Sequence, residues 1–306
     1  MQLSVVVPTL NGRDELPETL DSLAEHAPTA EVLVVNGPSA DGTSGLVCDS
    51  DRVDLVLELS DRNLNVARNA GIRAASGDAV AFVGQGTRIE STWFGAVESA
   101  LESGADAVTG PIHRRLDEDV TTESLEEARI GDRTIRFFDG GNVVFDRAAI
   151  EALDGFDEYL TVAAARDVAH RLAAQDRTLR WEPEAAVLRT AAPSHAGPVD
   201  IAGLAETNDA RAYRSLGYRL AKNYGLHWRV ARHLGGRLLT DGLRAGWDAL
   251  RGESKPSGWP GQGRDAMVAV SRGVRDGLAA RYTDRTPRRN PHGVSARRDR
   301  PVSRCE

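Results

Sequence analysis

A run of five consecutive apolar residues, Ala79–Val83, constrains the fold of this chain more than any other stretch. The run does not alternate with polar residues, which is typical of a strand covered on both faces of its sheet. Leu3–Val7 and Glu31–Val35 have the same length, and leucines spaced by four and three between residues 16 and 23 mark an amphipathic helix between them. This order of strands and helices predicts an α/β fold with a mostly parallel sheet and right-handed crossovers.

The same periodicities predict the next elements. A third strand is expected at Val53–Leu59, followed by a helix that carries Arg68. A second amphipathic helix is expected at Ile89–Ala107, with Trp93 in the core, because apolar residues recur there every four positions. Residues 113–135 are charged and irregular, and they are predicted to form a mobile surface loop.

Three loops follow the predicted strands at the edge where open α/β sheets bind ligands. They read Thr-Leu-Asn-Gly at residues 9–12, Asn-Gly-Pro-Ser at residues 36–39 and Gly-Gln-Gly at residues 84–86. One such loop ends a strand in any α/β protein, but three in this order are more specific. The first 190 residues resemble a family 2 glycosyltransferase with the GT-A fold, a family that binds nucleotide-sugar donors.

The resemblance implies a set of donor-binding residues. In the family, the first loop and the end of the second strand hold the base and the ribose; the matching residues here are Pro8, Thr9, Asn11 and Asn36. Asn36 departs from the usual Asp, and an amide binds sugar hydroxyls more weakly than a carboxylate does. Arg68 matches an arginine that lies near the donor, where its planar fork suits a diphosphate. The alternative for Arg68 is a solvated helix arginine.

The family normally holds a divalent metal with an Asp-x-Asp triplet, which here is Gly84, Gln85 and Gly86. The leaving nucleoside diphosphate still needs neutralising, by a metal or by positive groups. Arginines stand at the positions Arg68, Arg88, Arg166 and Arg189. We therefore predict transfer without a cofactor, with some of these arginines and the backbone N–H groups of the Gly84–Gly86 turn holding the phosphates. Mn²⁺ or Mg²⁺ remains the alternative, although its usual ligands are missing.

The acceptor half of the resemblance contains a candidate base. Residues 153–158 read Leu-Asp-Gly-Phe-Asp-Glu, similar to the family's Gly-Gly-Phe-Asp-Glu. Asp167 matches the family's catalytic Asp, while Arg166 replaces the Glu before it. An inverting transferase needs a carboxylate that takes the proton of the acceptor hydroxyl. At the start of a helix, Asp167 would alternatively serve only as an N-terminal cap.

Charge divides the chain into an acidic body and a basic tail. Residues 1–200 carry 35 acidic and 17 basic side chains, while residues 201–306 carry 10 and 21. We predict a GT-A-like domain at 1–200, a basic amphipathic region at 201–253, a linker with a short helix at 254–282, and a disordered tail at 283–306. Leucines, aromatic residues and arginines within 211–251 favour an anionic membrane surface, and an ordinary packed helix is the alternative. No nucleic-acid motif is present.

The remaining features bear on compartment. No run approaches 18 apolar residues, and the N-terminus enters a strand without a basic region or a cleavage site, so we expect a peripheral protein on the cytoplasmic face of the membrane. Cys48 and Cys305 are too few for a disulfide framework and are predicted to be free thiols. The arginine-rich, lysine-poor composition resembles that of haloarchaeal proteins.

These observations predict an inverting glycosyltransferase that moves a sugar from a nucleotide donor to a membrane-held acceptor. The predicted acceptor is a dolichyl phosphate-linked glycan, used in protein N-glycosylation or in surface polysaccharide assembly. The alternative is a non-catalytic membrane-associated subunit of a glycosylation complex. Nucleotidyl transfer fits less well, because the first loop lacks a glycine-rich phosphate motif and a signature lysine. The donor sugar, the linkage and the oligomeric state stay open.

Overall fold

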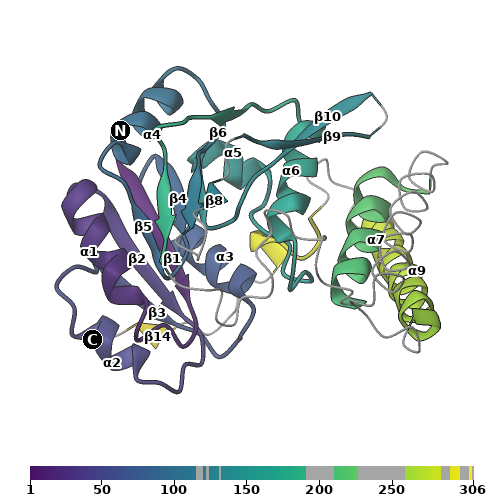
Figure 1. The fold of residues 1–306 in the computed structure, drawn as a ribbon, viewed down its shortest axis with the longest axis horizontal. Coiled ribbons are helices and arrows are strands. Elements are labelled where there is room, and N and C mark those ends of the chain that lie inside the picture. Colours follow the sequence, from purple (N-terminus) through teal and green to yellow (C-terminus); the bar gives the residue numbers. More distant parts are fainter. Residues whose placement is uncertain are drawn as a thin grey trace.

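The computed structural model describes residues 1–114, 120–121, 124–130, 132–190, 210–226, 259–283, 290–296 and 303–304 (Figure 1). An eight-stranded sheet forms its centre, in the order β12-β6-β11-β4-β1-β2-β3-β14. The strands are β1 (Leu3–Thr9), β2 (Glu31–Asn36), β3 (Leu55–Glu58), β4 (Ala79–Val83), β6 (Ala107–Thr109), β11 (Asn142–Asp146), β12 (Leu179–Trp181) and β14 (Ser303–Arg304).

Most neighbouring strands in this sheet run parallel. β1 pairs in parallel with β2 and β4, β2 with β3, and β12 with β6. β11 is antiparallel to both β4 and β6, and β14 is antiparallel to β3. The α/β fold with a mostly parallel sheet is therefore confirmed.

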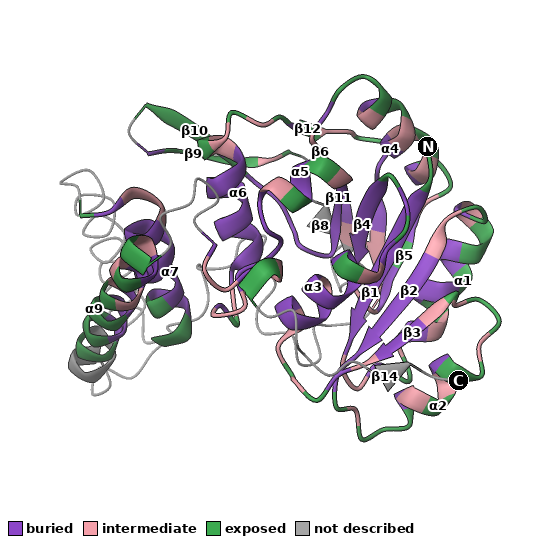
Figure 2. Ribbon diagram, turned by 180° about the vertical axis from the view of Figure 1, so that it is seen from behind, coloured by how far each residue is buried: buried purple, intermediate pink, exposed green. Residues whose placement is uncertain are grey.

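Two hydrophobic cores lie on the two faces of the sheet, which explains why its strands lack polar alternation. In β1, Val6 packs into one core while Val5 and Val7 pack into the other. Figure 2 shows the buried strands between flanking helices. These helices are α1 (Leu16–His26), α2 (Thr43–Cys48), α3 (Leu64–Ala74), α4 (Trp93–Glu102), α5 (Arg147–Ala152) and α6 (Ala164–Ala174).

Residues 113–135 contain strands where a mobile loop was predicted. β7 (Ile112–Arg114), β8 (Val120–Thr121), β5 (Thr87–Ile89) and β13 (Val187–Arg189) form a second sheet, while β9 (Glu126–Ile130) and β10 (Arg133–Phe137) form a hairpin. In the hairpin, Ile130, Ile135 and Phe137 are buried and charged residues stand between them. This alternation, with Gly-Asp at residues 131–132, is a hairpin signal that the interpretation as a loop overlooked.

The C-terminal region packs against the domain wherever it is described. α7 (Ala210–Tyr224) lies beside α9 (Trp259–Thr283) and contacts α6 (Figure 1). Residues 290–296, which include the short helix η2 (Val294–Ala296), bind the turn at Asp154, and β14 extends the sheet. Disorder was predicted for these two segments and is wrong for them.

The membrane-binding face predicted within residues 211–251 falls mostly on residues 227–251, outside the described part of the chain. The two tyrosines Tyr213 and Tyr218, assigned to that surface, are buried. In α7 the alternative of a helix packed on the domain therefore holds. Across the described residues, no helix combines the length and the apolar character that crossing a bilayer requires.

One of the two cysteines is oxidised. Cys48, at the end of α2, is disulfide-bonded, so the prediction of a free thiol there is wrong. No other cysteine lies among the described residues, so the cysteine bonded to Cys48 lies outside them.

Candidate functional site

Loops from three strands meet at the carboxyl edge of the sheet, where Gln85 ties two of them together. Its Oε1 accepts hydrogen bonds from Thr9 Oγ1 at 2.7 Å and from the Leu10 backbone N–H at 2.9 Å. Its Nε2 donates to Glu15 at 2.9 Å. The first loop and the Gly84–Gly86 turn thus form one surface, as the sequence predicted from their positions after β1 and β4.

The second loop joins the same edge through asparagines. Asn36 is fully buried; it donates to Ser44 Oγ at 2.9 Å and accepts from Ser39 Oγ at 2.7 Å. Ser39 in turn accepts from the backbone N–H of Asn11 at 2.8 Å, and Asn11 adopts a left-handed conformation with φ of 52°. Asn36 therefore holds the first and second loops together, and both ends of its amide are occupied by protein groups.

Glycines allow the turn after β4 and the loop before β11 to approach closely. Gly84 N–H donates to Gly141 O at 3.1 Å, and a Cβ on Gly141 would lie 3.4 Å from Gly84 N. Gly86 has φ of +67°, which favours glycine. The antiparallel β11 brings its first residues to this edge, so Gly140 and Gly141 line the site opposite the turn.

The residues at this turn do not fit a divalent metal. Hard cations take oxygen ligands, and carboxylates above all. Gly84 and Gly86 have no side chain, and the amide oxygen of Gln85 already accepts two hydrogen bonds. Within the described residues no group of three or more His, Cys, Asp or Glu side chains could hold a metal ion.

Two of the four predicted arginines flank Gly140 and Gly141. Arg68 donates from Nη2 to Gly140 O at 3.2 Å and from Nη1 to Asn65 at 2.8 Å. On the other side, Arg189 donates from Nη2 to Asp139 at 3.3 Å. Arg189 Nη1 is buried and has no hydrogen-bond partner among the described residues. Two guanidinium groups therefore stand beside Gly140 and Gly141, which contact the Gly84–Gly86 turn.

The other two arginines lie elsewhere. Arg88 is exposed on β5. Arg166 forms a two-pronged ion pair with Glu126 and stacks 4.4 Å over the ring of Phe137, so its charge is compensated on the β9–β10 side. The prediction that these two neutralise phosphate charge has no support from their positions.

Asp167 is buried in a network of ion pairs. Its carboxylate therefore does not face a cleft, as the predicted role of catalytic base would require. Its Oδ2 accepts from Arg171 Nε and Lys222 Nζ, both at 2.8 Å, and its Oδ1 accepts from Asn223 at 2.9 Å. Burial alone would raise the pKa of this carboxyl, but the positive charges of Lys222 and Arg171 outweigh it and hold the pKa well below its usual range. Nor is Asp167 the helix cap, because α6 begins after Ala163.

Lys222 is a central residue of this site that sequence reasoning missed. Its fully buried ammonium bridges Asp167 and Asp157, donating to Asp157 at 2.7 Å. Tyr218 donates to the same Asp157 oxygen at 2.8 Å, and burial raises the pKa of its phenol. The available signal was weak: Lys222 is one of only two lysines in an arginine-rich chain.

Asn69 and Asp78 have structural roles. Asn69 donates to Phe156 O at 2.9 Å and accepts from Phe156 N–H at 2.8 Å, which fixes α3 to the turn before α6. Asp78 accepts from the Gln2 backbone N–H at 3.0 Å. Trp93 is a buried core residue that donates to Asn142 at 3.0 Å.

Comparison with known proteins agrees with this geometry. Residues 4–153 match the family described as Glycosyl transferase family 2. The comparison with curated proteins found no match to this chain. Residues 1–349 of S. aureus TarS in complex with UDP-GlcNAc superpose with a TM-score of 0.63 at 19% identity, covering 92% of this chain and 84% of TarS 1–349.

A second solved structure has the same fold. The mannosyltransferase PcManGT from Pyrobaculum calidifontis, in complex with GDP-Man and Mn²⁺, superposes with a TM-score of 0.55 at 18% identity, covering 90% of this chain and 87% of that one. At such identities the likeness establishes the fold. Residues 4–153 therefore match glycosyl transferase family 2, and the chain has the GT-A fold of these solved structures.

Proposed function

We propose that this protein transfers a sugar from a nucleotide-sugar donor to an acceptor hydroxyl, with inversion at the anomeric carbon. The observation that carries the proposal is the convergence of the β1 loop, the Gly84–Gly86 turn and two arginines at the carboxyl edge of a family 2 domain. Both solved relatives were determined with nucleotide sugars, UDP-GlcNAc and GDP-Man. The donor is expected to lie along Pro8, Thr9 and Asn11, with its diphosphate at the turn.

Protein groups replace the metal in this proposal. The departing diphosphate carries growing negative charge, and preorganised cations beside it lower the barrier. Arg68 and Arg189 supply this charge from the two sides of Gly140–Gly141. The test is glycosyl transfer with EDTA present: activity should persist, whereas full inhibition that manganese relieves would contradict the proposal.

Asp167 is the base that the resemblance assigns, and its protein contacts set a condition on that role. A base needs an oxygen within hydrogen-bond reach of the acceptor hydroxyl. Lys222, Arg171 and Asn223 occupy both oxygens in this structure. Because Asp167 is also fully buried, an acceptor hydroxyl reaches it only if α7, which carries Lys222 and Asn223, moves away.

The proposed acceptor is a lipid-linked glycan, such as a dolichyl phosphate saccharide, held at the cytoplasmic face of the membrane. The support is the excess of basic residues in the C-terminal third, which an anionic surface attracts. Sedimentation with anionic lipid vesicles tests this. Binding should fall steeply between low and high salt if charge dominates, and equal binding to neutral vesicles would contradict it.

A second candidate is a non-catalytic subunit of a glycosylation complex. The occupied carboxylate of Asp167 favours it, because no other residue matches the family base. Titration of purified protein with UDP-GlcNAc and GDP-mannose by calorimetry separates the two proposals, since an enzyme binds a nucleotide sugar. Binding of neither, together with unchanged glycan assembly in cells carrying Asp167→Asn, would favour the subunit.

A further inference from the structure

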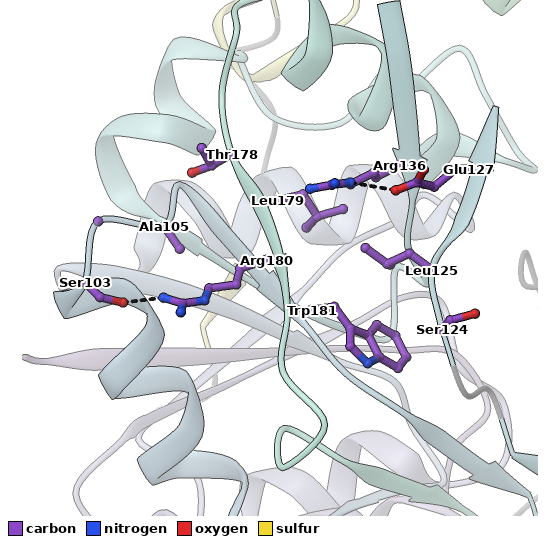
Figure 3. Close-up of a pocket in the computed structure, with 11 residues that line it drawn as sticks. Ser103, Ala105, Ser124, Leu125, Glu127, Arg136, Thr178, Leu179, Arg180 and Trp181 are labelled. Carbon is purple, nitrogen blue, oxygen red and sulfur yellow. Dashed lines mark hydrogen bonds and ion pairs between the residues drawn. The ribbon is translucent and has the colours of Figure 1, made fainter. Parts of the chain in front are cut away.

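Two adjoining cavities follow the edge strand β12 beneath the β9–β10 hairpin. The larger has a volume of 670 Å³ and extends to Ser103 and Leu179 (Figure 3). The smaller has a volume of 260 Å³ and lies at the carboxyl edge of the sheet, beside Asp139. Both are lined by Trp181 and the residues Ser124 and Leu125, so together they form one groove that ends next to the candidate donor site.

Trp181 gives the middle of the groove an aromatic wall. The side chain is half-buried, and Figure 3 shows it beside Leu125 of the segment that precedes β9. An indole offers an apolar ring face and one N–H donor at its edge. Such a wall suits a ligand that is apolar on one side and hydroxylated on its rim.

Every charged side chain that lines the groove has a partner of opposite charge. Arg136 bonds Glu127 at 2.8 Å on the hairpin, and Arg180 bonds Glu182 at 2.8 Å on the opposite wall (the first pair is drawn in Figure 3). The remaining two are Glu126, paired with Arg166, and Asp139, paired with Arg189. An anionic ligand would need an uncompensated cation. The groove therefore matches an uncharged ligand that hydrogen-bonds to polar side chains.

The inner end of the groove offers an unused acceptor. Asp139 is 8% exposed and lines the smaller cavity. Its Oδ1 accepts from Gly141 N–H at 2.7 Å and from Arg189, but its buried Oδ2 has no hydrogen-bond partner in the described residues. A buried carboxylate oxygen without a partner is costly, and a ligand hydroxyl in this cavity would satisfy it.

We propose that this groove binds a neutral glycan of two or more sugar units, whose terminal unit reaches Asp139 and whose next unit stacks on Trp181. The proposal rests on the proposed glycosyl transfer and names the class of its acceptor. The larger cavity alone lies within the ~300–1,000 Å³ typical of small-molecule sites. The inner end of the groove is lined by Asp139, which contacts Gly141 and Arg189, where the donor sugar is expected.

The test uses the full chain, labelled with ¹⁵N, and four neutral disaccharides: cellobiose, maltose, mannobiose and chitobiose. Trp181→Phe identifies the indole N–H signal of Trp181 by its disappearance. At least one disaccharide should shift that signal in the wild-type protein, and the corresponding monosaccharide should do so only at a higher concentration. No shift with any of the four overturns the proposal.

Variants then connect binding to the groove. Trp181→Ala should weaken the disaccharide by about tenfold or more, because a central aromatic contact is lost. Trp181→Phe keeps a ring and should retain most of the affinity, while Met267→Ala, an exposed apolar change on α9, should have no effect. Equal affinity in Trp181→Ala, or displacement of the disaccharide by inorganic pyrophosphate, also overturns the proposal.

Donor binding separates this proposal from the proposed function. Calorimetry with UDP-GlcNAc and GDP-mannose is repeated on Trp181→Ala, where donor affinity should be unchanged. If the protein binds a disaccharide but neither nucleotide sugar, the proposed glycan groove is supported and the proposed glycosyl transfer is contradicted. If it binds a nucleotide sugar but none of the disaccharides, the proposed glycosyl transfer is supported and the groove is contradicted.

Discussion

At the residue scale, the site is decided by which charges remain available to a ligand. Arg166 pairs through both terminal nitrogens with Glu126, whereas Arg189 Nη1 has no hydrogen-bond partner among the described residues. Asp167 has both oxygens occupied, whereas Asp139 Oδ2 has no partner in the same part of the chain. Asp139 and Arg189, each with an unbonded buried atom, thus lie together beside Gly141.

Arg189→Met is expected to weaken UDP binding by about tenfold or more, because a charge-assisted hydrogen bond to phosphate is worth ~1.5–3 kcal/mol. Uridine, which lacks phosphate, should bind both proteins equally in calorimetric titrations. Arg88→Met is the matched control, since Arg88 is exposed on β5 and should leave UDP affinity unchanged. Equal UDP affinity in Arg189→Met would show that the diphosphate lies elsewhere.

The buried pair of Lys222 and Asp167 predicts acid sensitivity. The folded pKa of Asp167 is depressed below its unfolded value of about 3.9, so its stabilisation is present above that pH and is lost as pH falls towards the folded pKa. The free energy of unfolding of the wild-type protein, measured with urea, should fall as the pH drops below ~4. Asp167→Asn should be less stable at pH 7 and should lose less on acidification.

Asp49→Asn is the control for this pH series, because Asp49 is exposed at the end of α2. Its stability should follow the wild-type curve at every pH. Parallel curves for wild type and Asp167→Asn would mean that the network contributes no pH-dependent stability.

Sequence reasoning succeeded where a local pattern decides a residue's role and failed where distant partners decide it. Trp93 was assigned to the core from the four-residue spacing of apolar residues, and its side chain is buried. Asp167 was correctly placed near the start of a helix, but its environment comes from Lys222, 55 residues later in the chain. No local sequence pattern around Asp167 indicates that Lys222 will contact it.

At the element scale, fully apolar strands were predictable and amphipathic ones were overlooked. β4 was predicted with its exact bounds, because five apolar residues in a row have one simple explanation in an α/β chain. β9 and β10 alternate charged and buried residues, and their charge was taken as a sign of a loop. The antiparallel β11 also brings Asp139 to the site, which a purely parallel interpretation would place elsewhere.

Glycines hold α7 and α9 close together, and Gly273→Ala should separate them. A Cβ on Gly273 would lie 2.0 Å from Arg214 O, so the backbone has to move, at a cost of about 1–3 kcal/mol. Gly95→Ala in α4 is the matched control, because nothing lies within 4 Å of its added Cβ; it should stabilise by roughly 0.5–1 kcal/mol. Chemical denaturation measures both, and equal effects would contradict this tight packing.

At the scale of the whole molecule, the C-terminal residues close the domain. Asn290 donates to Asp154 O at 2.8 Å, Ser295 N–H donates to the Asp154 carboxylate at 2.8 Å, and β14 covers the edge strand β3. Disorder was predicted here from the content of proline and charged residues. Composition does not show which residues of the domain these segments contact. Covering an edge strand also removes a site where other chains could pair.

Asn290→Ala is expected to destabilise the protein by about 1–3 kcal/mol, since it removes a buried hydrogen bond and leaves Asp154 O without that donor. Hydrogen exchange should speed up selectively in residues 290–296. Thr283→Ala, which alters an exposed hydroxyl at the end of α9, should leave that exchange unchanged. Unaltered exchange in Asn290→Ala would mean that other contacts hold the segment.

The bridge made by Lys222 has a consequence for how such domains are exchanged between proteins. The family segment ends at residue 153, yet the two acidic groups just beyond it are neutralised from residue 222. A chimera that borrows the chain up to the end of α6 inherits Asp157 and Asp167 without Lys222. The smallest portable unit of this transferase fold therefore includes α7, although sequence similarity alone would cut it away.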